Sequence, residues 1–434
     1  MLDPKYIREN IDLVKEAIEK KKASVDLDFW LKLDKEKRAL QQKAEEVKHQ
    51  QKVASQEITQ NPEKKEELIK AVSQTKQQIK KWEKELKKIE KKWKDILMEI
   101  PNPPAPEMPV GQDENDNVVI KKWGEKPQFD FSPQDHMALG EKLNLIDVKK
   151  AAEVSGSRFY YLKNEAVLLQ MALINFVFQT LTDEKIIQKI IQQENLKLSS
   201  KPFIPMLPPV MIRDEVQKSI HRVFGDQTYQ LKEDKLNLVA SAEHTMAPYY
   251  MNETVKEEEL PLRYIGYSTA FRREAGSYGK DLGGILRTHQ FDKLEMESFT
   301  TAETGVEEQK LIVALQEYLV QQLGIPYRLV HVCTGDTGKP DYDQYDIECW
   351  MPGQNKYRET HTSDYMTDYQ MRGVKAYYKT KEGQRVLLHT NDATAFAIGR
   401  ILIAILENNQ QKDGSVTIPK VLRPWLGGRE IISR

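Results

Sequence analysis

Apolar residues recur at intervals of three, four and seven through much of the first hundred residues. In residues 28–60 the spacing is seven, Asn61 and Pro62 interrupt it, and a second apolar stripe follows. Two such stripes joined by one turn predict an antiparallel coiled-coil hairpin of two helices. At about 1.5 Å per residue, the predicted arm is on the order of 50 Å long. The stripes consist of Leu33, Leu40, Val47 and Ala54, then Leu68, Val72, Ile79, Trp82, Leu86, Ile89, Trp93 and Ile96.

A shorter helix is predicted before this arm, and a linker after it. Asp3 as N-cap and Pro4 in the first turn favour a helix over residues 3–22, with apolar residues at helical spacing. Residues 101–106 contain four prolines and predict a semi-rigid linker. We therefore expect an N-terminal domain over residues 1–106, with its arm at about 28–99, and a second domain over residues 107–434.

The second domain has a different pattern, in which short strand-like runs outnumber helices. Runs of strands with few helices between them predict an antiparallel sheet, so the fold class is α+β with helices flanking that sheet. The predicted helices are 135–153, 164–182, 305–323 and 393–408. The predicted strands are 203–207, 236–240, 264–271, 286–301, 327–332, 344–351 and 385–390.

The distribution of charge along the chain is more informative than the net charge. The chain has 65 Lys and Arg against 66 Asp and Glu, so net charge alone predicts no polyanionic partner. Residues 32–99, however, carry 19 basic and 13 acidic residues, while the remainder of the chain is slightly acidic. Such a basic arm could bind nucleic acid through its phosphates. The alternative is that the lysines only solvate a narrow coiled coil.

The remaining composition favours a protein of a reducing compartment. Cys333 and Cys349 are the two cysteines, too few for a zinc cluster, and we expect no zinc. The first residues, Met1-Leu2-Asp3-Pro4, do not resemble a secretion signal. No apolar run approaches the roughly 20 residues that span a bilayer. We expect a cytoplasmic protein with no membrane partner.

The most informative chemistry lies in residues 271–295. Here Arg272, Glu274, Arg287 and Glu295 surround a glycine-rich turn between two predicted strands. Arginine suits phosphate because its planar fork donates two parallel hydrogen bonds and keeps its charge. The last carboxylate could pair with a cationic amine. The alternative is an ordinary hairpin with solvated charges.

Three further groups could contribute to the same site. They are Pro208-Pro209, the run Ser241-Ala242-Glu243, and residues 359–362 taken together with residues 389–400. Glu359 and Thr362 could hold a divalent cation between phosphates, because Mg²⁺ prefers few carboxylates plus phosphate oxygens. Each group alone is more often structural than functional. The sequence has no P-loop and no dinucleotide-binding fingerprint, which leaves arginines and Mg²⁺ to handle phosphate.

Together these motifs resemble a seryl-tRNA synthetase of the bacterial type, a class II aminoacyl-tRNA synthetase, over nearly the whole chain. The start of the chain, the coiled arm, the proline linker and residues 154–159 are similar to the family. Pro208-Pro209 resembles class II motif 1, residues 271–274 motif 2, and Gly399-Arg400 motif 3. The resemblance implies an ATP-dependent serine–tRNA ligase that forms seryl-adenylate and transfers seryl to tRNA(Ser), with tRNA(Sec) as a second acceptor. It also implies a homodimer and an arm that holds tRNA.

The resemblance further implies residue roles. Catalysis would involve Arg272, Arg287, Glu359 and Arg400. ATP would be bound by Arg272, Arg273, Glu274, Thr288, Phe291, Glu359, Thr360, His361, Thr362 and Arg400. Serine would be bound by Ser241, Ala242, Glu243, Arg272, Glu295, Asp392 and Thr394, with Glu295 pairing the amino group. Mg²⁺ would be held by Glu359 and Thr362.

The sequence departs from the family pattern at several positions. Residues 215–224 replace a glycine-rich stretch, Ser241 replaces a threonine, and Gly283 stands where an arginine is common. Residues 360–361, Thr-His, replace Ile-Ser, and Asp392 replaces an asparagine. We expect Asp392 to weaken serine binding, because it adds charge beside a neutral group.

Two other function classes remain open from the sequence. One is a synthetase-like enzyme that loads a carrier protein, although such relatives lack a long arm. The other is a coiled-coil interaction protein with an inactive domain, against which the retention of both the arginines and the carboxylates argues. Loss of tRNA charging, with amino-acid activation kept, after deletion of about residues 30–97 would identify the enzyme for tRNA.

Overall fold

The computed structural model describes residues 1–60, 65–222, 225–275 and 284–434. Within it, the chain divides into two compact units, Met1–Pro103 and Pro104–Arg434. The division falls inside the proline-rich segment. Most of the glycine-rich turn of the predicted hairpin, including Gly283, lies outside the described residues.

The first unit begins with two short helices, where the sequence predicted one. They are α1 (Pro4–Glu9) and α2 (Ile11–Lys20). The predicted cap is present, because the Asp3 carboxylate accepts a hydrogen bond from the Lys5 amide at 2.6 Å. The helix breaks at Asn10, whose φ of −133° is incompatible with an α-helix.

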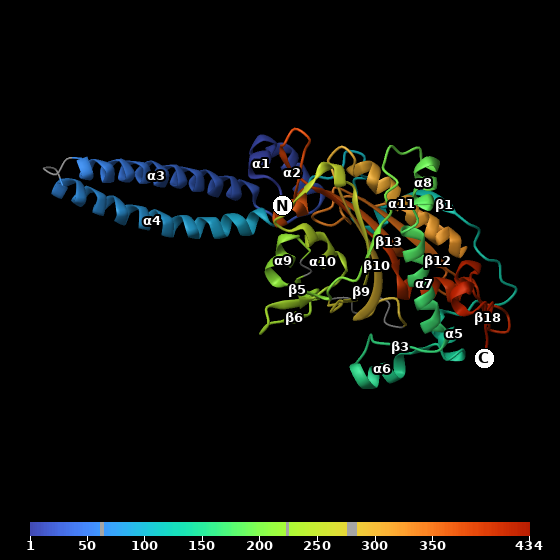
Figure 1. Cartoon of the computed structure of the whole chain (residues 1–434). Coiled ribbons are helices and arrows are strands. Elements are labelled where there is room, and N and C mark those ends of the chain that lie inside the picture. The colour runs from blue at the N-terminus through green and yellow to red at the C-terminus, as the bar shows by residue number, and fades with distance from the viewer. Residues whose placement is uncertain (61–64, 223–224, 276–283) are drawn as a thin grey trace. The chain divides into compact units, whose positions relative to one another are not determined.

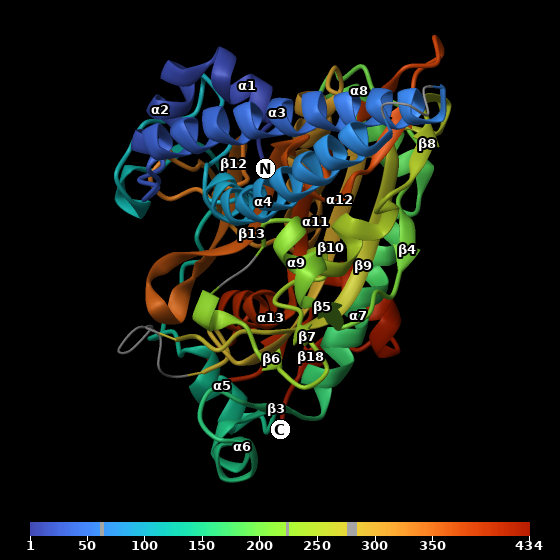
Figure 2. The ribbon, with the colours of Figure 1, turned by 90° about the vertical axis from the view of Figure 1, so that its left-hand side faces the viewer.

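The arm consists of α3 (Leu27–Gln60) and α4 (Lys65–Leu97), which Figures 1 and 2 show side by side. This confirms the predicted antiparallel hairpin. Its base is held by Trp30 and Trp93, whose rings stack at 5.7 Å. Trp93 also donates to the buried carboxylate of Asp34 at 3.2 Å, and Arg8 and Arg38 neutralise that carboxylate. Aromatic stacking and ion pairing therefore fix the base of the arm.

The second unit is built on an eight-stranded sheet with the order β1-β11-β12-β13-β16-β10-β9-β4. All neighbours are antiparallel except β4 and β9, which are parallel. The predicted antiparallel sheet is therefore correct for all but one edge. Residues 207–261 separate β4 from β9, and a connection of that length lets the chain return in the same direction. The strands are β1 (Val118–Trp123), β4 (Ile204–Met206), β9 (Leu262–Phe271), β10 (Gln290–Thr300), β11 (Tyr327–His331), β12 (Asp343–Met351), β13 (Lys356–Thr367) and β16 (His389–Ala397).

Four helices pack with this sheet around one hydrophobic core. They are α7 (Glu165–Leu181), α8 (Glu184–Gln193), α11 (Gly305–Leu323) and α13 (Ile398–Asn408). In Figure 1, α7 and α11 lie to the right of β9 and β10. Leu173, Leu315 and Ile403 are fully buried in this core, one from each of the three longer helices. The predictions for residues 164–182 and 305–323 are confirmed.

Two of the predicted helices have wrong boundaries. Residues 135–153 form α5 (His136–Lys142), then β2 (Ile146–Asp147) and α6 (Val148–Ser155), because Asn144 adopts a left-handed φ of +55°. Residues 393–397 continue β16, so the helix begins at Ile398. Residues 393–397 pair with β10, and Ala393 pairs with β13 as well, which outweighs the helix preference of alanine.

Smaller elements surround the sheet and carry part of the site. Predicted strand 236–240 shortens to β7, and 385–390 is divided between β15 and β16. These elements are β3 (Tyr161–Leu162), β5 (Met211–Arg213), α9 (Asp214–Ser219), β6 (Gln230–Leu231), β7 (Leu236–Leu238), α10 (Glu243–Met246), β8 (Thr254–Lys256), α12 (Tyr369–Val374), β14 (Tyr377–Lys379), β15 (Arg385–Leu387), β17 (Val416–Thr417) and β18 (Ile431–Ile432).

In the part of the chain that is described, no single helix is long and apolar enough to span a membrane. The bent pair α7 and α8 meets the criteria of length and composition together, with an angle of 70° between them.

Candidate active site

A cavity lies over the central strands β9, β10, β13 and β16, beside the starts of α10 and α13. It collects most of the residues that the sequence singled out, although they come from segments up to 159 positions apart. The predicted residues that line it are Ser241, Glu243, Arg272, Glu274, Arg287, Thr288, Phe291, Glu295, Glu359, Thr360, Thr362, Asp392, Thr394 and Arg400.

Arg272 stands at the end of β9, where the backbone still pairs with the chain leading into β10. Its amide donates to the His289 carbonyl at 3.0 Å, and its Nε donates to the Ala240 carbonyl at 3.2 Å. The guanidinium carbon lies 5.3 Å from the ring centroid of Phe291, within cation–π distance. Arg272 and Phe291 thus form one wall of the cavity, which presents a charged group beside an aromatic ring.

Glu274 and Arg287 form an ion pair across the two sides of the hairpin. Arg287 Nη1 lies 3.0 Å from Glu274 Oε2. Glu274 has a φ of +49°, an uncommon conformation for a residue with a side chain. Arg158 Nη1 donates to the Glu274 carbonyl at 3.3 Å and helps to hold this conformation.

Glu359 on β13 and Arg400 in the first turn of α13 form a second pair. Arg400 Nη1 donates to both the carboxylate and the carbonyl of Glu359, each at 2.8 Å. Loss of solvation raises the pKa of Glu359, but Arg400 and Arg272 outweigh this and hold the pKa below its usual value. Gly399 allows a close approach here, because a Cβ at this position would lie only 3.1 Å from the Ile285 carbonyl oxygen.

Thr362 lines the cavity from the same strand as Glu359. Together these two side chains could supply two of the ligands of a Mg²⁺ ion. One carboxylate and one hydroxyl leave the remaining positions to phosphate oxygens and water, as Mg²⁺ prefers. Among the described residues, no group of three or more His, Cys, Asp or Glu could hold a metal ion. A metal here would therefore be held jointly with a nucleotide.

Lys293 and Glu295 lie on β10 at the inner part of the cavity. Lys293 Nζ is 2.5 Å from Glu295 Oε2 and 3.3 Å from Ser241 Oγ. Burial raises the pKa of Glu295, and Lys293 opposes that shift. A buried carboxylate with one cationic neighbour can pair with the ammonium group of a ligand.

Three predicted residues lie outside the lining of the cavity. His361 is fully buried, its ring contacts Phe396 at 5.6 Å, and burial lowers its pKa to about 3. Ala242 is fully buried beneath the cavity. Arg273 is exposed, and its guanidinium carbon lies 6.0 Å from the ring of Tyr229. His361 and Ala242 are core residues, whereas Arg273 lies outside the cavity.

Sequence reasoning missed three charged residues that line the cavity: Arg222, Lys293 and Asp364. Two of them could have been found from the sequence, because side chains two residues apart on a strand lie on the same face of the sheet. Lys293 precedes Glu295 by two residues, and Asp364 follows Thr362 by two. Arg222 had no such signal, since it follows α9 in a segment noted only for its departure from the family.

Comparison with known proteins identifies the family. Residues 1–104 match the seryl-tRNA synthetase N-terminal domain, and residues 227–409 match the tRNA synthetase class II core domain (G, H, P, S and T). The serine–tRNA ligase of Deinococcus radiodurans is 38% identical, with 100% of this chain and 99% of the relative covered. The chain belongs to the seryl-tRNA synthetase family.

Other relatives agree over the full length. The serine–tRNA ligase of Dictyoglomus thermophilum is 40% identical over 99% of both chains. The crystal structure of seryl-tRNA synthetase from Pyrococcus horikoshii, complexed with ATP, superposes with a TM-score of 0.87 at 36% identity, covering 100% of this chain and 99% of that one. Membership of the seryl-tRNA synthetase family makes the chain an ATP-dependent class II serine–tRNA ligase and confirms the predicted family and function.

Proposed function

We propose that the cavity binds ATP and serine together and joins them as seryl-adenylate. The observation that carries this proposal is the presence of Arg272, Arg287 and Arg400 in one cavity with the buried carboxylate of Glu295. Arginines match phosphate, and a carboxylate matches the ammonium group of an amino acid.

In this proposal the nucleotide lies against the wall formed by Arg272 and Phe291. Phe291 stacks on the adenine, and Glu274 and the backbone at Thr288 contact its edge. Arg272 contacts the α-phosphate, and Arg400 contacts the γ-phosphate. Arg287 bridges the α-phosphate and the reacting carboxylate. Glu359 and Thr362 would hold Mg²⁺ together with the phosphates, and the bound ion would supply charge stabilisation.

Serine lies deeper, with its ammonium group on Glu295 and its side chain near Ser241, Glu243, Asp392 and Thr394. Its carboxylate attacks the α-phosphorus and pyrophosphate leaves. The 3′-hydroxyl of tRNA then takes the seryl group and releases AMP. No protein nucleophile is required, so the residues act by positioning the reactants and by stabilising charge in the transition state.

The test of this assignment is exchange of labelled pyrophosphate into ATP without tRNA. Exchange must require serine and a divalent cation. Replacing Arg272 by Ala must reduce the rate by about 100-fold or more, the usual cost of one group that stabilises developing charge. Exchange that is independent of Arg272 would contradict the assignment.

The arm is proposed to bind tRNA(Ser). The basis is its surplus of basic residues over residues 32–99 together with its match to the family's N-terminal domain. Lysines attract a nucleic-acid backbone without reading base sequence, and RNA shape can supply the specificity. Homodimer formation, a cytoplasmic location and charging of tRNA(Sec) stay predictions from the family resemblance.

A further inference from the structure

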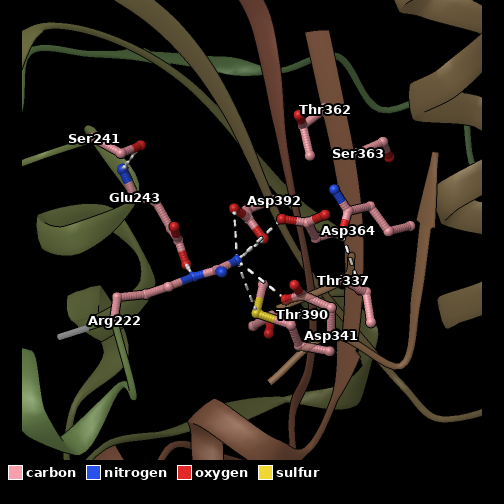
Figure 3. A network of polar contacts seen from close by, with 12 residues as sticks. Arg222, Ser241, Glu243, Thr337, Asp341, Thr362, Ser363, Asp364, Thr390 and Asp392 are labelled. Carbon is pink, nitrogen blue, oxygen red and sulfur yellow. Dashed lines mark hydrogen bonds and ion pairs between the residues drawn. The ribbon is translucent and has the colours of Figure 1, made fainter. Parts of the chain in front are cut away.

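Arg222 lies among four carboxylates at one side of the cavity. Figure 3 shows its guanidinium directed at all of them. Its Nε lies 2.6 Å from Glu243 Oε1, and its Nη2 lies 3.1 Å from Asp364 Oδ2, 3.2 Å from Asp392 Oδ1 and 3.3 Å from Asp341 Oδ1. One guanidinium therefore contacts four carboxyl groups.

Two buried side chains hold the backbone at Arg222 in place. Gln217 in α9 donates from Nε2 to the Arg222 carbonyl at 3.2 Å, and its Oε1 accepts from Asn237 Nδ2 at 2.7 Å. Both Gln217 and Asn237 are buried. His221, immediately before Arg222, has a left-handed φ of +60°. The described part of the segment that replaces the family's glycine-rich stretch, residues 215–222, is thus held by specific hydrogen bonds at Arg222, and residues 223–224 lie outside the described residues.

The four carboxylates come from separate parts of the fold. Asp364 on β13 and Asp392 on β16 are direct cross-strand partners, Glu243 begins α10, and Asp341 precedes β12. Each of the four side chains is at most 10% exposed. Removing one partner of a buried ion pair is strongly destabilising, so the contacts of these four carboxyl groups with Arg222 support the fold at this side of the cavity.

Arg222 also fixes the orientation of Asp392 within the cavity. Both carboxylate oxygens of Asp392 contact Nη2, at 3.2 and 3.3 Å. Glu243 Oε1 is held from two sides, by Arg222 and by Gln370 Nε2 at 2.7 Å. Asp392 therefore enters the cavity with Arg222 as a direct partner, and its expected effect on serine binding stays a prediction.

We propose that Arg222 is a positioning residue that sets amino-acid specificity, by holding Asp392 and Glu243 as hydrogen-bond acceptors for a small hydroxylated side chain. The inference rests on the proposed serine-binding role of this cavity. A side chain without a hydroxyl leaves these polar groups unpaired, which is costly in a buried site. A larger side chain must displace the guanidinium from its partners.

A double-mutant cycle in the full-length chain tests the proposal. The variants are Arg222→Gln, Asp392→Asn and the two together, and the readout is pyrophosphate exchange with serine, alanine and threonine. We expect Arg222→Gln to raise the KM for serine about tenfold or more, with the KM for ATP unchanged, because it strands buried carboxylates beside the substrate. The double variant should recover part of the loss, since one of the four carboxylates that contacted Arg222 has become a neutral amide.

The preference for serine over alanine is a second readout, and it would not change if Arg222 had a purely structural role. Asp392→Asn should reduce the preference for serine over alanine, because an amide pairs less well with the Arg222 guanidinium. A matched control is Arg263→Gln, which breaks the fully buried pair with Glu308 outside the cavity. This control should lower thermal stability and leave the serine KM of the folded enzyme unchanged. If Arg222→Gln does not fold, Arg222→Lys replaces it. Lysine keeps the positive charge but lacks the planar guanidinium group.

The outcomes separate this inference from the proposed function. Absence of serine-dependent exchange in the unmodified enzyme would overturn the proposed function itself. Normal exchange combined with an unchanged serine KM in Arg222→Gln, or in Arg222→Lys if only that variant folds, would overturn the role of Arg222 alone. Strictly additive effects in the double variant, or an unchanged preference for serine over alanine in Asp392→Asn, would also overturn it.

Discussion

Lys293 Nζ and Glu295 Oε2 lie 2.5 Å apart on the same strand, deep in the cavity. Glu295 is buried, and Lys293 is its nearest cation. The cavity therefore already contains a cation beside the carboxylate that we assign to the ammonium group of serine. An incoming ammonium group must share Glu295 with Lys293 or release Lys293 toward other anions.

Glu295→Gln should raise the KM for serine by roughly 30-fold or more, because it removes one partner of a buried charged hydrogen bond. The KM for ATP should change little. Steady-state pyrophosphate exchange measures both constants. Glu317→Gln is a suitable control, since Glu317 pairs with Lys121 outside the cavity. An equal rise in both KM values would show that Glu295 supports the site without contacting serine.

The Glu359–Arg400 pair predicts a linked dependence on Mg²⁺ and ATP. Glu359→Gln should raise the Mg²⁺ concentration needed for half-maximal exchange, because a neutral amide is a poorer ligand for this ion. Arg400→Gln should raise the KM for ATP by on the order of tenfold or more, since it removes a charged contact to phosphate. Titration of each variant with Mg²⁺ at fixed ATP distinguishes the two effects. A Mg²⁺ requirement unchanged in Glu359→Gln would contradict its assignment as a ligand.

Buried carboxylates near the cavity predict that stability falls at alkaline pH. Burial, and then neighbouring carboxylates, raise the pKa of Glu297, Asp364 and Asp392 well above the usual value. The folded state then binds more protons than the unfolded state above about pH 4. The stabilisation is complete below the unfolded pKa and is lost as the pH rises through the folded pKa. Urea denaturation from about pH 5 to pH 9 should show a falling midpoint.

Glu297→Gln isolates one of these groups. Neither carboxylate oxygen of Glu297 has a hydrogen-bond partner among the residues that the structure describes. An amide cannot ionise, so this variant should lose less stability than the unmodified protein as the pH rises. Glu233→Gln, an exposed change, is the control. Parallel pH profiles for Glu297→Gln and the unmodified protein would show that Glu297 does not change protonation on folding.

The exposed lysines of α4 predict a salt-dependent tRNA step. Replacing Lys84, Lys87, Lys88 and Lys91 by Gln removes four charges from exposed positions. The KM for tRNA in the charging assay should rise by about tenfold or more and become less sensitive to salt, because fewer counterions are released on binding. Pyrophosphate exchange without tRNA should not change. Unaltered charging would show that tRNA binds elsewhere.

The sequence best predicts the elements that have a long, local pattern of apolar residues. Heptads specify α3 and α4, and helical spacing specifies α7 and α11. The prediction was wrong where strand pairing determines the secondary structure. In β16 the alanines favour a helix, but the strand lies between two others in the sheet. It was also wrong at Asn10 and Asn144, where single backbone angles interrupt helices.

The same limit applies to the cavity. Motif-based prediction identified the arginines and carboxylates, because each stands at a recognisable position. The family resemblance assigns His361 to ATP, but sequence alone did not predict that this side chain is fully buried with its ring against Phe396. Arg222 could not be found, since its four partners are spread over 150 residues and meet only in the folded chain.

The central claim is that this cavity activates serine. The most direct measurement is amino-acid-dependent pyrophosphate exchange with serine, threonine, alanine, glycine and cysteine, without tRNA. The account predicts strong exchange with serine and at least about 100-fold weaker exchange, relative to KM, with alanine and glycine, which lack the hydroxyl. Equal exchange with alanine, or no exchange with serine, would contradict it.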